Sequence, residues 1–168
     1  MSESIEQDRL KKFRGAPFSP EVVEAAVGSI RKQTGWHIAP ERVEEAEVDT
    51  INGRSFQLDT AYLLDVLEIR DGDNPEAEPF DGKLRVRRNG KVTALTGRMP
   101  AYCIVSFRHG YEKFPADLLP VVADRARASA QGRIRAESLA SRSITFEVSG
   151  DPLSSPIVDL YRVRPGPA

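Results

Sequence analysis

Two Asn-Gly dipeptides, at residues 52–53 and 89–90, constrain the fold of this chain more than any other feature of its sequence. An Asn-Gly pair between β-prone residues is a strong hairpin signal, because both residues accept the positive φ angles of a tight turn. At residues 89–90 a two-residue turn places Val86 opposite Thr93. The residues that then share one face are Leu84, Val86, Thr93 and Leu95. At residues 52–53 a tight turn pairs charged with apolar residues, so we expect a longer loop or a bulge.

Four other segments are informative about β-structure and loops. Residues 64–69 are rich in leucine, valine and isoleucine and precede Asp71-Gly72, which predicts a strand. The acidic stretch 71–82 is rich in proline and glycine and predicts a surface loop. The apolar run 102–107 predicts the central strand, and the alternation at 143–148 predicts one more.

A first helix is predicted to begin at Pro20. Ser19 is a favourable N-cap, and proline at the first helical position loses no hydrogen bond. Gly35 provides a left-handed end. Gly28 inside the helix costs about 1 kcal/mol relative to alanine, which we interpret as a sign of close packing against a neighbour. The apolar stripe consists of Val23, Ala26, Val27 and Ile30.

A second helix is predicted to begin at Pro115 or to be capped by Asp117, and to end at Gly132. Pro120 favours the later start, because a proline within the first turn lacks only an N–H that has no partner in the helix. Small residues on this helix would let another helix approach closely; they are Ala123, Ala126, Ala128 and Ala130. Arg125 and Arg127 would face either nucleic acid or solvent, and we favour solvent.

These elements predict an α+β fold. It has two main helices, a short C-terminal helix or tail, and a small antiparallel sheet built from hairpins. The domain organisation that we expect is an N-terminal arm at 1–17, a domain at 18–150 and a C-terminal tail at 151–168. A single cysteine excludes an intrachain disulfide. No signal-peptide pattern or membrane-length apolar run occurs, so we expect a reducing compartment and no membrane.

No residue set has the spacing of a known reaction centre. Acid–base catalysis needs a histidine within hydrogen-bond reach of a nucleophile and an orienting group, and the sequence places neither His37 nor His109 in such a set. We therefore expect no enzyme, no cofactor and no metal ion. We interpret Cys103 as a buried thiol inside a strand. The residues assigned to structural turns are Gly35, Trp36, His37, His109, Gly110 and Tyr111.

The acidic residues are concentrated in the first half of the chain. Residues 1–82 hold 9 Lys and Arg against 18 Asp and Glu, whereas residues 83–168 hold 15 against 7. Opposite poles on one chain suit head-to-tail self-association, although ordinary surface scatter is an equal alternative. Acidic residues at the first strand would line a cation site or, as we favour, form a solvated edge that discourages strand pairing. These residues are Glu41, Glu44, Glu45 and Glu47.

Several segments resemble, in matching order, the head-to-tail adaptor proteins of long-tailed bacteriophages, also called connector or head completion proteins. The likeness is greatest to members from phages and prophages of actinobacteria and covers roughly residues 15–165. Pro120 and the long acidic loop at 71–82 depart from the family pattern. The segments that carry it are FSPEVV at 18–23, TGWHIAP at 34–40, LDT at 58–60, DVLEIRDG at 65–72 and FRHGYEKFPADL at 107–118.

The resemblance implies a structural function. Such proteins form a dodecameric ring beneath the portal protein, extend the DNA channel without binding DNA specifically, and support stopper or tail-joining proteins. The location it implies is the virion neck, with assembly in the host cytoplasm. The tail would reach the portal through Leu160, Tyr161, Arg162, Val163 and Arg164. The candidates for subunit packing on the second helix are Leu118, Val122, Ala126 and Ala130.

Two rival functions remain open at this point. A stopper or tail terminator would occupy another ring of the neck, but such proteins are mainly β-barrels, so a helix content below about 15% would favour that alternative. A DNA-binding regulator would use residues 117–135 and would bind duplex DNA with a marked salt dependence. An enzyme is the weakest alternative.

Overall fold

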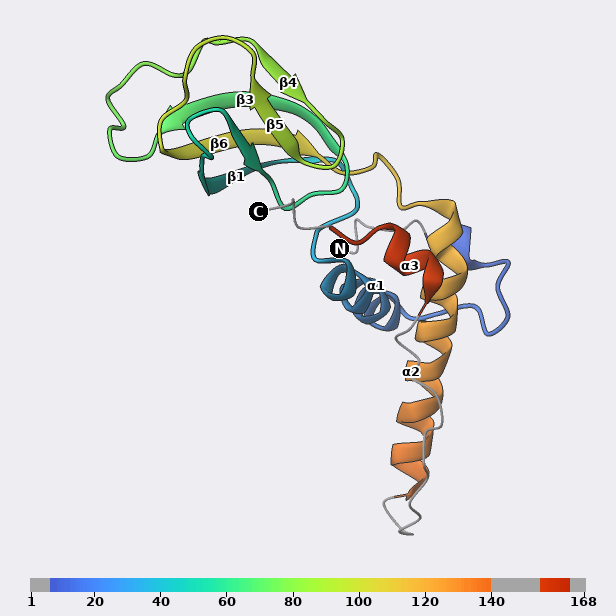
Figure 1. The fold of residues 1–168 in the computed structure, drawn as a ribbon. Coiled ribbons are helices and arrows are strands. Elements are labelled where there is room, and N and C mark those ends of the chain that lie inside the picture. The colour runs from blue at the N-terminus through green and yellow to red at the C-terminus, as the bar shows by residue number, and fades with distance from the viewer. Residues whose placement is uncertain (1–6, 140–154, 164–168) are drawn as a thin grey trace. The chain divides into compact units, whose positions relative to one another are not determined.

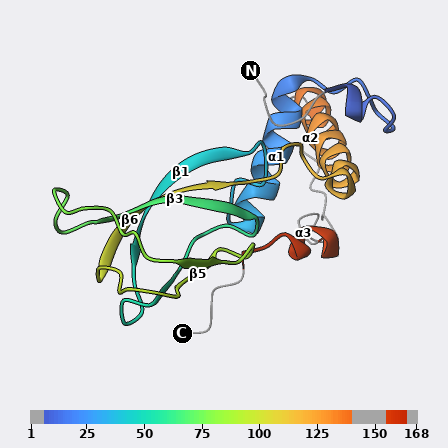
Figure 2. The same cartoon turned by 90° about the horizontal axis from the view of Figure 1, so that it is seen from above.

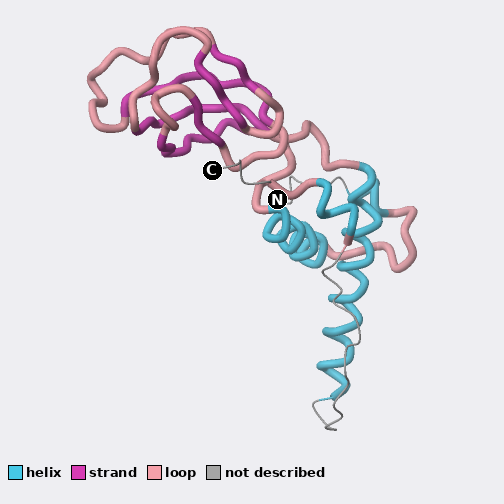
Figure 3. The backbone as a smooth tube through the Cα atoms, viewed as in Figure 1, coloured by secondary structure: helices cyan, strands magenta, loops and turns pink. Residues whose placement is uncertain are grey.

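A computed structural model describes residues 7–139 and 155–163. Its contacts divide the chain into two compact units. The first, which we call the helical unit, comprises Met1–Thr34 and Lys113–Tyr161, and the second, the β unit, comprises Gly35–Glu112 and Arg162–Ala168. Figures 1 and 3 show helices in the former and strands in the latter. The predicted α+β class is confirmed. The strand predicted at 143–148 lies outside the described residues.

The first helix, α1 (Pro20–Thr34), begins and ends where the sequence predicts. The backbone carbonyl of Ser19 accepts hydrogen bonds from the N–H groups of Val22 and Val23, and Gly35 follows the helix with a φ of +81°. The predicted apolar stripe is buried, with Val22 and Thr34 in addition. Since one face of α1 is apolar, its stability depends on burying that face, which it does against α2.

The second helix has a more gradual start than predicted. Pro115, in an extended conformation, precedes the 3-10 turn η2 (Ala116–Leu118), and α2 (Leu119–Leu139) follows directly. Pro120 therefore takes the second helical position, where its missing N–H costs nothing. The predicted end at Gly132 is wrong, because the helix continues to Leu139. A glycine lowers helix stability by about 1 kcal/mol but ends a helix only where the chain turns left-handed.

Two short elements complete the helical unit. The turn η1 (Gln7–Leu10) contacts α2 and buries Leu10, within the segment predicted as an arm. The helix α3 (Pro156–Leu160) contacts α1 and η2 and buries Val158 completely. Figure 2 shows α1 and α2 side by side. None of the helices in the described part of the chain has an apolar stretch long enough to cross a bilayer.

The β unit contains two antiparallel sheets of three strands each. The first has the order β1-β6-β3, so the strand predicted to be central is central. The second has the order β2-β5-β4, and only its β4-β5 pair is a hairpin of consecutive strands. The expectation of one sheet built from hairpins is therefore wrong in its connectivity. The strands are β1 (Arg42–Asp49), β2 (Ser55–Gln57), β3 (Leu63–Asp71), β4 (Leu84–Val86), β5 (Lys91–Ala94) and β6 (Tyr102–His109).

The predicted register of the β4-β5 hairpin is wrong by one residue. Val86 pairs with Val92, not with Thr93. The connection is longer than two residues: the N–H of Arg87 donates to the carbonyl of Lys91, and Gly90 has a φ of +84°. A glycine in this conformation at the end of a three-residue loop forms a bulge. The shift turns Val92 and its face into the core, and both Val92 and Ala94 are buried.

The turn at residues 52–53 is longer than a tight hairpin, as predicted. Ile51 and Ser55 form a single isolated bridge, and the two residues after Ile51 both have positive φ angles. The chain then leaves β1, which pairs with β6 over its full length, and enters β2, which pairs with β5. The core that results is made of residues from both sheets, namely Phe56, Leu58, Leu63, Ile69, Val92, Ala94, Met99, Cys103, Val105 and Phe107.

Replacing Gly28 by alanine is expected to stabilise the chain by about 0.5–1 kcal/mol. A Cβ at this helical position meets nothing within 4 Å, so the interpretation of Gly28 as a close-packing site is wrong. Alanine at this position loses less backbone entropy on folding and costs no contact. Urea denaturation followed by circular dichroism at the helix band measures the change. Lower stability in Gly28→Ala would contradict the open environment seen here.

Candidate functional site

The two turns singled out in the sequence lie together in the β unit. The N–H of Tyr111 donates to the carbonyl of Ile38 at 2.8 Å. Gly110 has a φ of +101°, and a Cβ there would lie 2.9 Å from the carbonyl oxygen of Pro40. The backbone of the first turn therefore passes so close to Gly110 that no side chain fits between them. The parts of the two segments that belong to the β unit, GWHIAP and FRHGYE, thus form one structural feature.

Aromatic rings cover this junction. Trp36 is 6% exposed, and its ring centroid lies 6.3 Å from that of His109 and 6.2 Å from that of Tyr111. Tyr111 stacks on Tyr62 at 4.1 Å, and the guanidinium of Arg88 lies 5.1 Å from the Tyr62 ring. Because buried aromatic side chains contribute large contact areas, this cluster is a major source of stability for the β unit.

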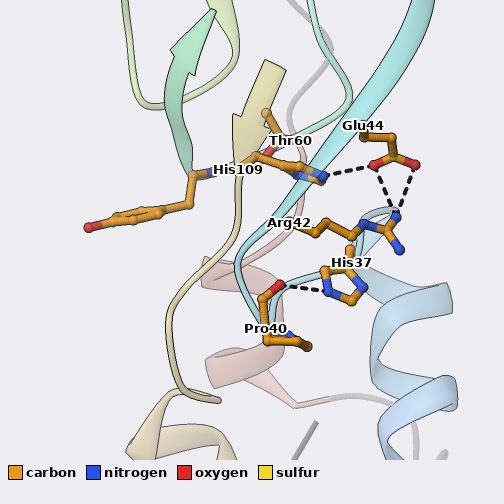
Figure 4. Close-up of polar contacts among 7 residues, drawn as sticks. His37, Pro40, Arg42, Glu44, Thr60 and His109 are labelled. Carbon is orange, nitrogen blue, oxygen red and sulfur yellow. Dashed lines mark hydrogen bonds and ion pairs between the residues drawn. The ribbon is translucent and has the colours of Figure 1, made fainter. Parts of the chain in front are cut away.

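His109 is the centre of a partly buried hydrogen-bond network (Figure 4). Its Nε2 lies 2.7 Å from Oε2 of Glu44, and its Nδ1 lies 3.2 Å from Oγ1 of Thr60. An ionised carboxylate only accepts, so Nε2 carries the proton and Nδ1 accepts from the Thr60 hydroxyl. Thr60 in turn accepts from the N–H of Tyr62 at 3.2 Å. Arg42 donates through Nη2 to both oxygens of Glu44, at 2.9 and 3.0 Å.

The two titrating members of the network both have a lowered pKa, for different reasons. Burial is the largest influence on His109 and lowers its pKa from the ordinary 6.5, while Glu44 acts in the opposite direction. Burial by itself raises the pKa of Glu44, but the hydrogen bonds and charges of Arg42 and His109 outweigh it, and the pKa lies below 4.5. His109 is therefore neutral and Glu44 ionised near neutral pH, which is the state that the hydrogen bonds require.

A Thr-His-Glu line of this kind superficially resembles a catalytic triad, but substrate has no access to its nucleophile. Thr60 is 0% exposed and His109 is 2% exposed. The hydroxyl of Thr60 is also engaged by the backbone of Tyr62. A nucleophile must reach a reacting atom to act, so the arrangement holds β1 to β6 and to the segment after β2. His37 has a related function, since its Nε2 lies 2.8 Å from the carbonyl oxygen of Pro40.

Acidification is expected to destabilise the β unit through His109. Because its pKa is lower in the folded chain than the ordinary 6.5, the unfolded chain takes up the proton more readily, and the free energy of unfolding falls as the pH decreases below about 6.5. The contribution is fully present above that pH. Urea denaturation followed by the fluorescence of Trp36 measures the change. In His109→Gln the free energy of unfolding should change less steeply with pH between about pH 7 and pH 5. Equal slopes in the variant and the wild type would contradict the role given to His109.

The other titratable candidates have structural surroundings as well. Cys103 is buried in β6, and burial raises the pKa of its thiol to about 11, which leaves it protonated and unreactive. Glu41 and Glu45 form ion pairs with Arg108 and Arg70 across the first sheet, the latter at 2.5 Å. Among the described residues, no group of three acidic, histidine or cysteine side chains is arranged to hold a metal ion.

A groove of about 620 Å³ runs along β1 in the β unit. It opens between the edge of the first sheet at β1 and the edge of the second at β2. Its rim is charged and its floor is apolar. The lining side chains that define it are Trp36, Glu44, Val48, Asp49, Phe56, Leu58, Asp59, Phe107 and His109.

The residues expected to pack against other subunits belong largely to the interior of the helical unit. Leu118, Val122 and Ala126 are all 0% exposed within a single chain, so they have no surface to offer a neighbour in this conformation. Ala130 is half-buried. Sequence periodicity identified an apolar face correctly, but the face is covered by the chain's own elements, since α2 contacts α1.

The two arginines considered for nucleic acid also have partners within the helical unit. Arg125 donates to Oγ of Ser29 at 2.8 Å and to the side-chain carbonyl of Gln33. Arg127 donates to the backbone carbonyl of Arg14 at 3.1 Å and pairs with Asp124. Arg125 therefore joins α2 to α1.

The residues expected to contact the portal differ from one another in their surroundings. Leu160 is 74% exposed at the end of α3, whereas the hydroxyl of Tyr161 donates to both carboxylate oxygens of Asp117 at 2.8 Å. Arg162 is exposed and Val163 is half-buried. Arg164 lies outside the described residues.

The fold is similar to that of chains in two solved structures of GTA (gene transfer agent) particles. One is the neck of the native particle computed with C12 symmetry: the TM-score is 0.58 at 17% identity, over 87% of this chain and 82% of that chain. The other is the neck of the empty particle computed with C6 symmetry: the TM-score is 0.61 at 16% identity, over 94% of this chain and 86% of that chain. No family model and no curated protein matches the sequence.

Proposed function

We propose that this chain is a structural subunit of the neck of a phage-like particle, and within the neck a head-to-tail adaptor. Copies of the chain form a ring between the portal protein and the stopper or tail-joining proteins, and the ring extends the channel for DNA. The observation that carries the proposal is the likeness to neck chains over 87% and 94% of this chain. The symmetry of the native-particle neck supports a ring of twelve copies.

The internal chemistry of the chain supports the same proposal. Its buried histidine and threonine are used to hold strands together, and Arg125 holds two helices together. A protein whose function is carried by the shape of its surfaces needs stable units of this kind more than it needs a reactive cleft. The likeness to phage-like necks does not distinguish actinobacterial phages from others.

The helix content favours an adaptor over a stopper or tail terminator. The helices α1 and α2 are 15 and 21 residues long in a chain of 168, which is more than a fifth of the chain. This is above the limit of about 15% expected of a mainly β-barrel neck protein. The internal bonds of Arg125 and Arg127 give no support to a DNA-binding regulator.

Exposed residues of α3 are the proposed contact with the portal. Replacing Leu160, which is 74% exposed, by aspartate is expected to weaken binding to the portal protein of the same particle by about tenfold or more, because a charge at an apolar anchor is costly to bury. Leu67→Asp on the β unit is the matched control, since Leu67 is 51% exposed. Biolayer interferometry with immobilised portal measures both.

A point substitution is preferable to removal of the tail after Ser155. Val158 is completely buried in the helical unit, so truncation would remove part of its core together with the exposed residues. Binding by Leu160→Asp that equals the wild type, with the fold intact by circular dichroism, would contradict the portal contact. Failure of the wild-type chain to bind portal would contradict the adaptor itself.

A further inference from the structure

Among the described strands, β1 pairs with β6 and with no other in the order β1-β6-β3. Within residues 7–139 and 155–163, its other edge therefore has no strand partner and lies beside the groove. An edge strand directs half of its backbone N–H and C=O groups outward, where another chain can approach. The groove along it has a volume of about 620 Å³ and an apolar floor that includes Val48, Phe56 and Phe107. The edge and the groove together form a recess open to a partner.

The rim of this recess is acidic and only partly neutralised. Glu44 and Glu45 have basic partners within the chain. Asp49 and Asp59 also line the groove and are exposed, yet neither forms an ion pair with any described residue. Asp49 ends β1 and Asp59 follows β2, so the two uncompensated charges come from the two strands that border the groove.

The complementary charge lies on the β4-β5 hairpin. Residues 83–91, with the sequence KLRVRRNGK, contain five basic residues and no acidic one. Arg85 and Arg87 are exposed, and within the described ranges neither forms an ion pair. Five cations within nine residues repel one another, and a partner with acidic side chains would relieve that repulsion.

The acidic edge strand β1 and the basic strand β4 lie on opposite sides of the β unit, while the turn of the hairpin contacts the groove lining at Gln57 and Leu58. In the two sheets, β1 neighbours β2 at one side, whereas β3 neighbours β4 at the other. Figure 1 shows the corresponding separation of β1 from β4. A heterologous contact that closes into a ring requires two different, complementary surfaces on each subunit. The β unit presents such a pair.

We propose that the hairpin 83–91 of one copy docks against the acidic β1 groove of the next copy, so that successive β units associate head to tail around the ring. This inference rests on the proposed function, since it names the contact between adaptor subunits. A second copy fits the observations better than DNA does, because a nucleic acid on the basic hairpin would leave the acidic groove without a function and would be repelled by it.

Charge reversal on each side tests the contact. Arg85→Glu/Arg87→Glu changes the hairpin, and Asp49→Lys/Asp59→Lys changes the groove. Each double variant alone places like charges at the exchanged positions of every subunit contact, so its assembly on portal rings should fall by about tenfold or more. Native mass spectrometry measures the number of copies bound per portal ring. Circular dichroism and Trp36 fluorescence verify that the exposed substitutions leave the fold intact.

A mixture of the two variants provides the sharpest outcome. In an alternating ring the charge-reversed hairpin of one variant meets the charge-reversed groove of the other, and the unchanged hairpin of the second meets the unchanged groove of the first. The equimolar mixture should therefore regain ring assembly, with both variants present in equal numbers. A control with equal charge change, Glu76→Lys/Glu78→Lys in the 71–82 loop, should assemble as the wild type does.

The outcomes separate this inference from the proposed function. Wild-type rings together with normal assembly of both double variants would overturn the hairpin–groove contact and leave the adaptor proposal standing. Loss of duplex DNA binding by Arg85→Glu/Arg87→Glu, with ring assembly unchanged, would overturn it in favour of a nucleic-acid surface. Absence of wild-type rings on portal would count against the adaptor proposal itself.

Discussion

Replacing Trp36 by alanine is expected to lower the free energy of unfolding by about 3–5 kcal/mol. The side chain is 6% exposed and packs beside the rings of His109 and Tyr111. Alanine would leave a cavity at the junction of the two turns. The surroundings cannot close over it easily, because His109 is held on both ring nitrogens by Glu44 and Thr60. The loss of unfolding free energy should therefore lie at the upper end of the range for large-to-small substitutions in a core.

The measurement for Trp36→Ala must use a signal other than tryptophan fluorescence, since the chain has one tryptophan. Urea denaturation followed by circular dichroism provides it, and hydrogen exchange of the β6 amides locates the loss in the β unit. Trp36→Phe retains a ring and should lose less than half as much. A change below about 1 kcal/mol in Trp36→Ala would mean that the ring contributes little to the packing.

The second large effect is expected at Gly110. Alanine there would adopt a φ near +101° that L-residues rarely tolerate, and its Cβ would lie 2.9 Å from the carbonyl oxygen of Pro40 and 3.3 Å from that of Ile38. Both are backbone atoms, so relief requires movement of the whole first turn. We expect a destabilisation of about 2–4 kcal/mol from the two penalties together.

Gly28→Ala provides the matched comparison for Gly110→Ala, because the chemical change is the same and the expected sign is opposite. Trp36 fluorescence reports directly on the junction in the Gly110 variant, while circular dichroism follows both. A stability of Gly110→Ala equal to that of the wild type would show that the two turns can separate without cost. Their close approach would then not be the basis of the β unit's stability.

Local signals predicted the helical elements well. Ser19, Pro20 and Gly35 define α1 because capping and helix termination depend on residues within one turn of each end. The central position of β6 followed from its apolar run. The end of α2 was not predictable in the same way, since Gly132 is compatible both with a C-cap and with a helix interior, and only the continuation of the chain decides between them.

Pairing between strands distant in sequence was harder to predict. The β4-β5 register depends on one additional residue in the loop, and that residue inverts the faces of β5. The pairing of β1 with β6 joins residues about sixty positions apart, for which the sequence contains no local signal. The expectation of hairpins for the first sheet failed for this reason.

The candidate site was predictable in part. His109 and Trp36 were identified as turn residues, and the structure brings their turns together. Glu44 was identified only as an edge acid, and Thr60 only as part of the segment LDT at 58–60, because the contact of each with His109 crosses strands. Both ring nitrogens of a buried histidine need hydrogen-bond partners. Had the sequence shown that His109 is buried, it would also have predicted that two polar side chains lie next to it. Leu118 and Val122 were predicted to contact another copy, and they are buried within the chain itself. The sequence of an apolar helix face does not show whether the face is covered by the same chain or by another copy.

The most direct test of the central claim is a cryo-electron microscopy reconstruction of the neck of purified particles encoded together with this chain. We predict a ring of this fold directly below the portal, in twelve copies, with density continuous along the DNA channel. A neck that lacks this fold, or purified particles in which mass spectrometry detects none of this chain, would contradict the assignment as a neck subunit.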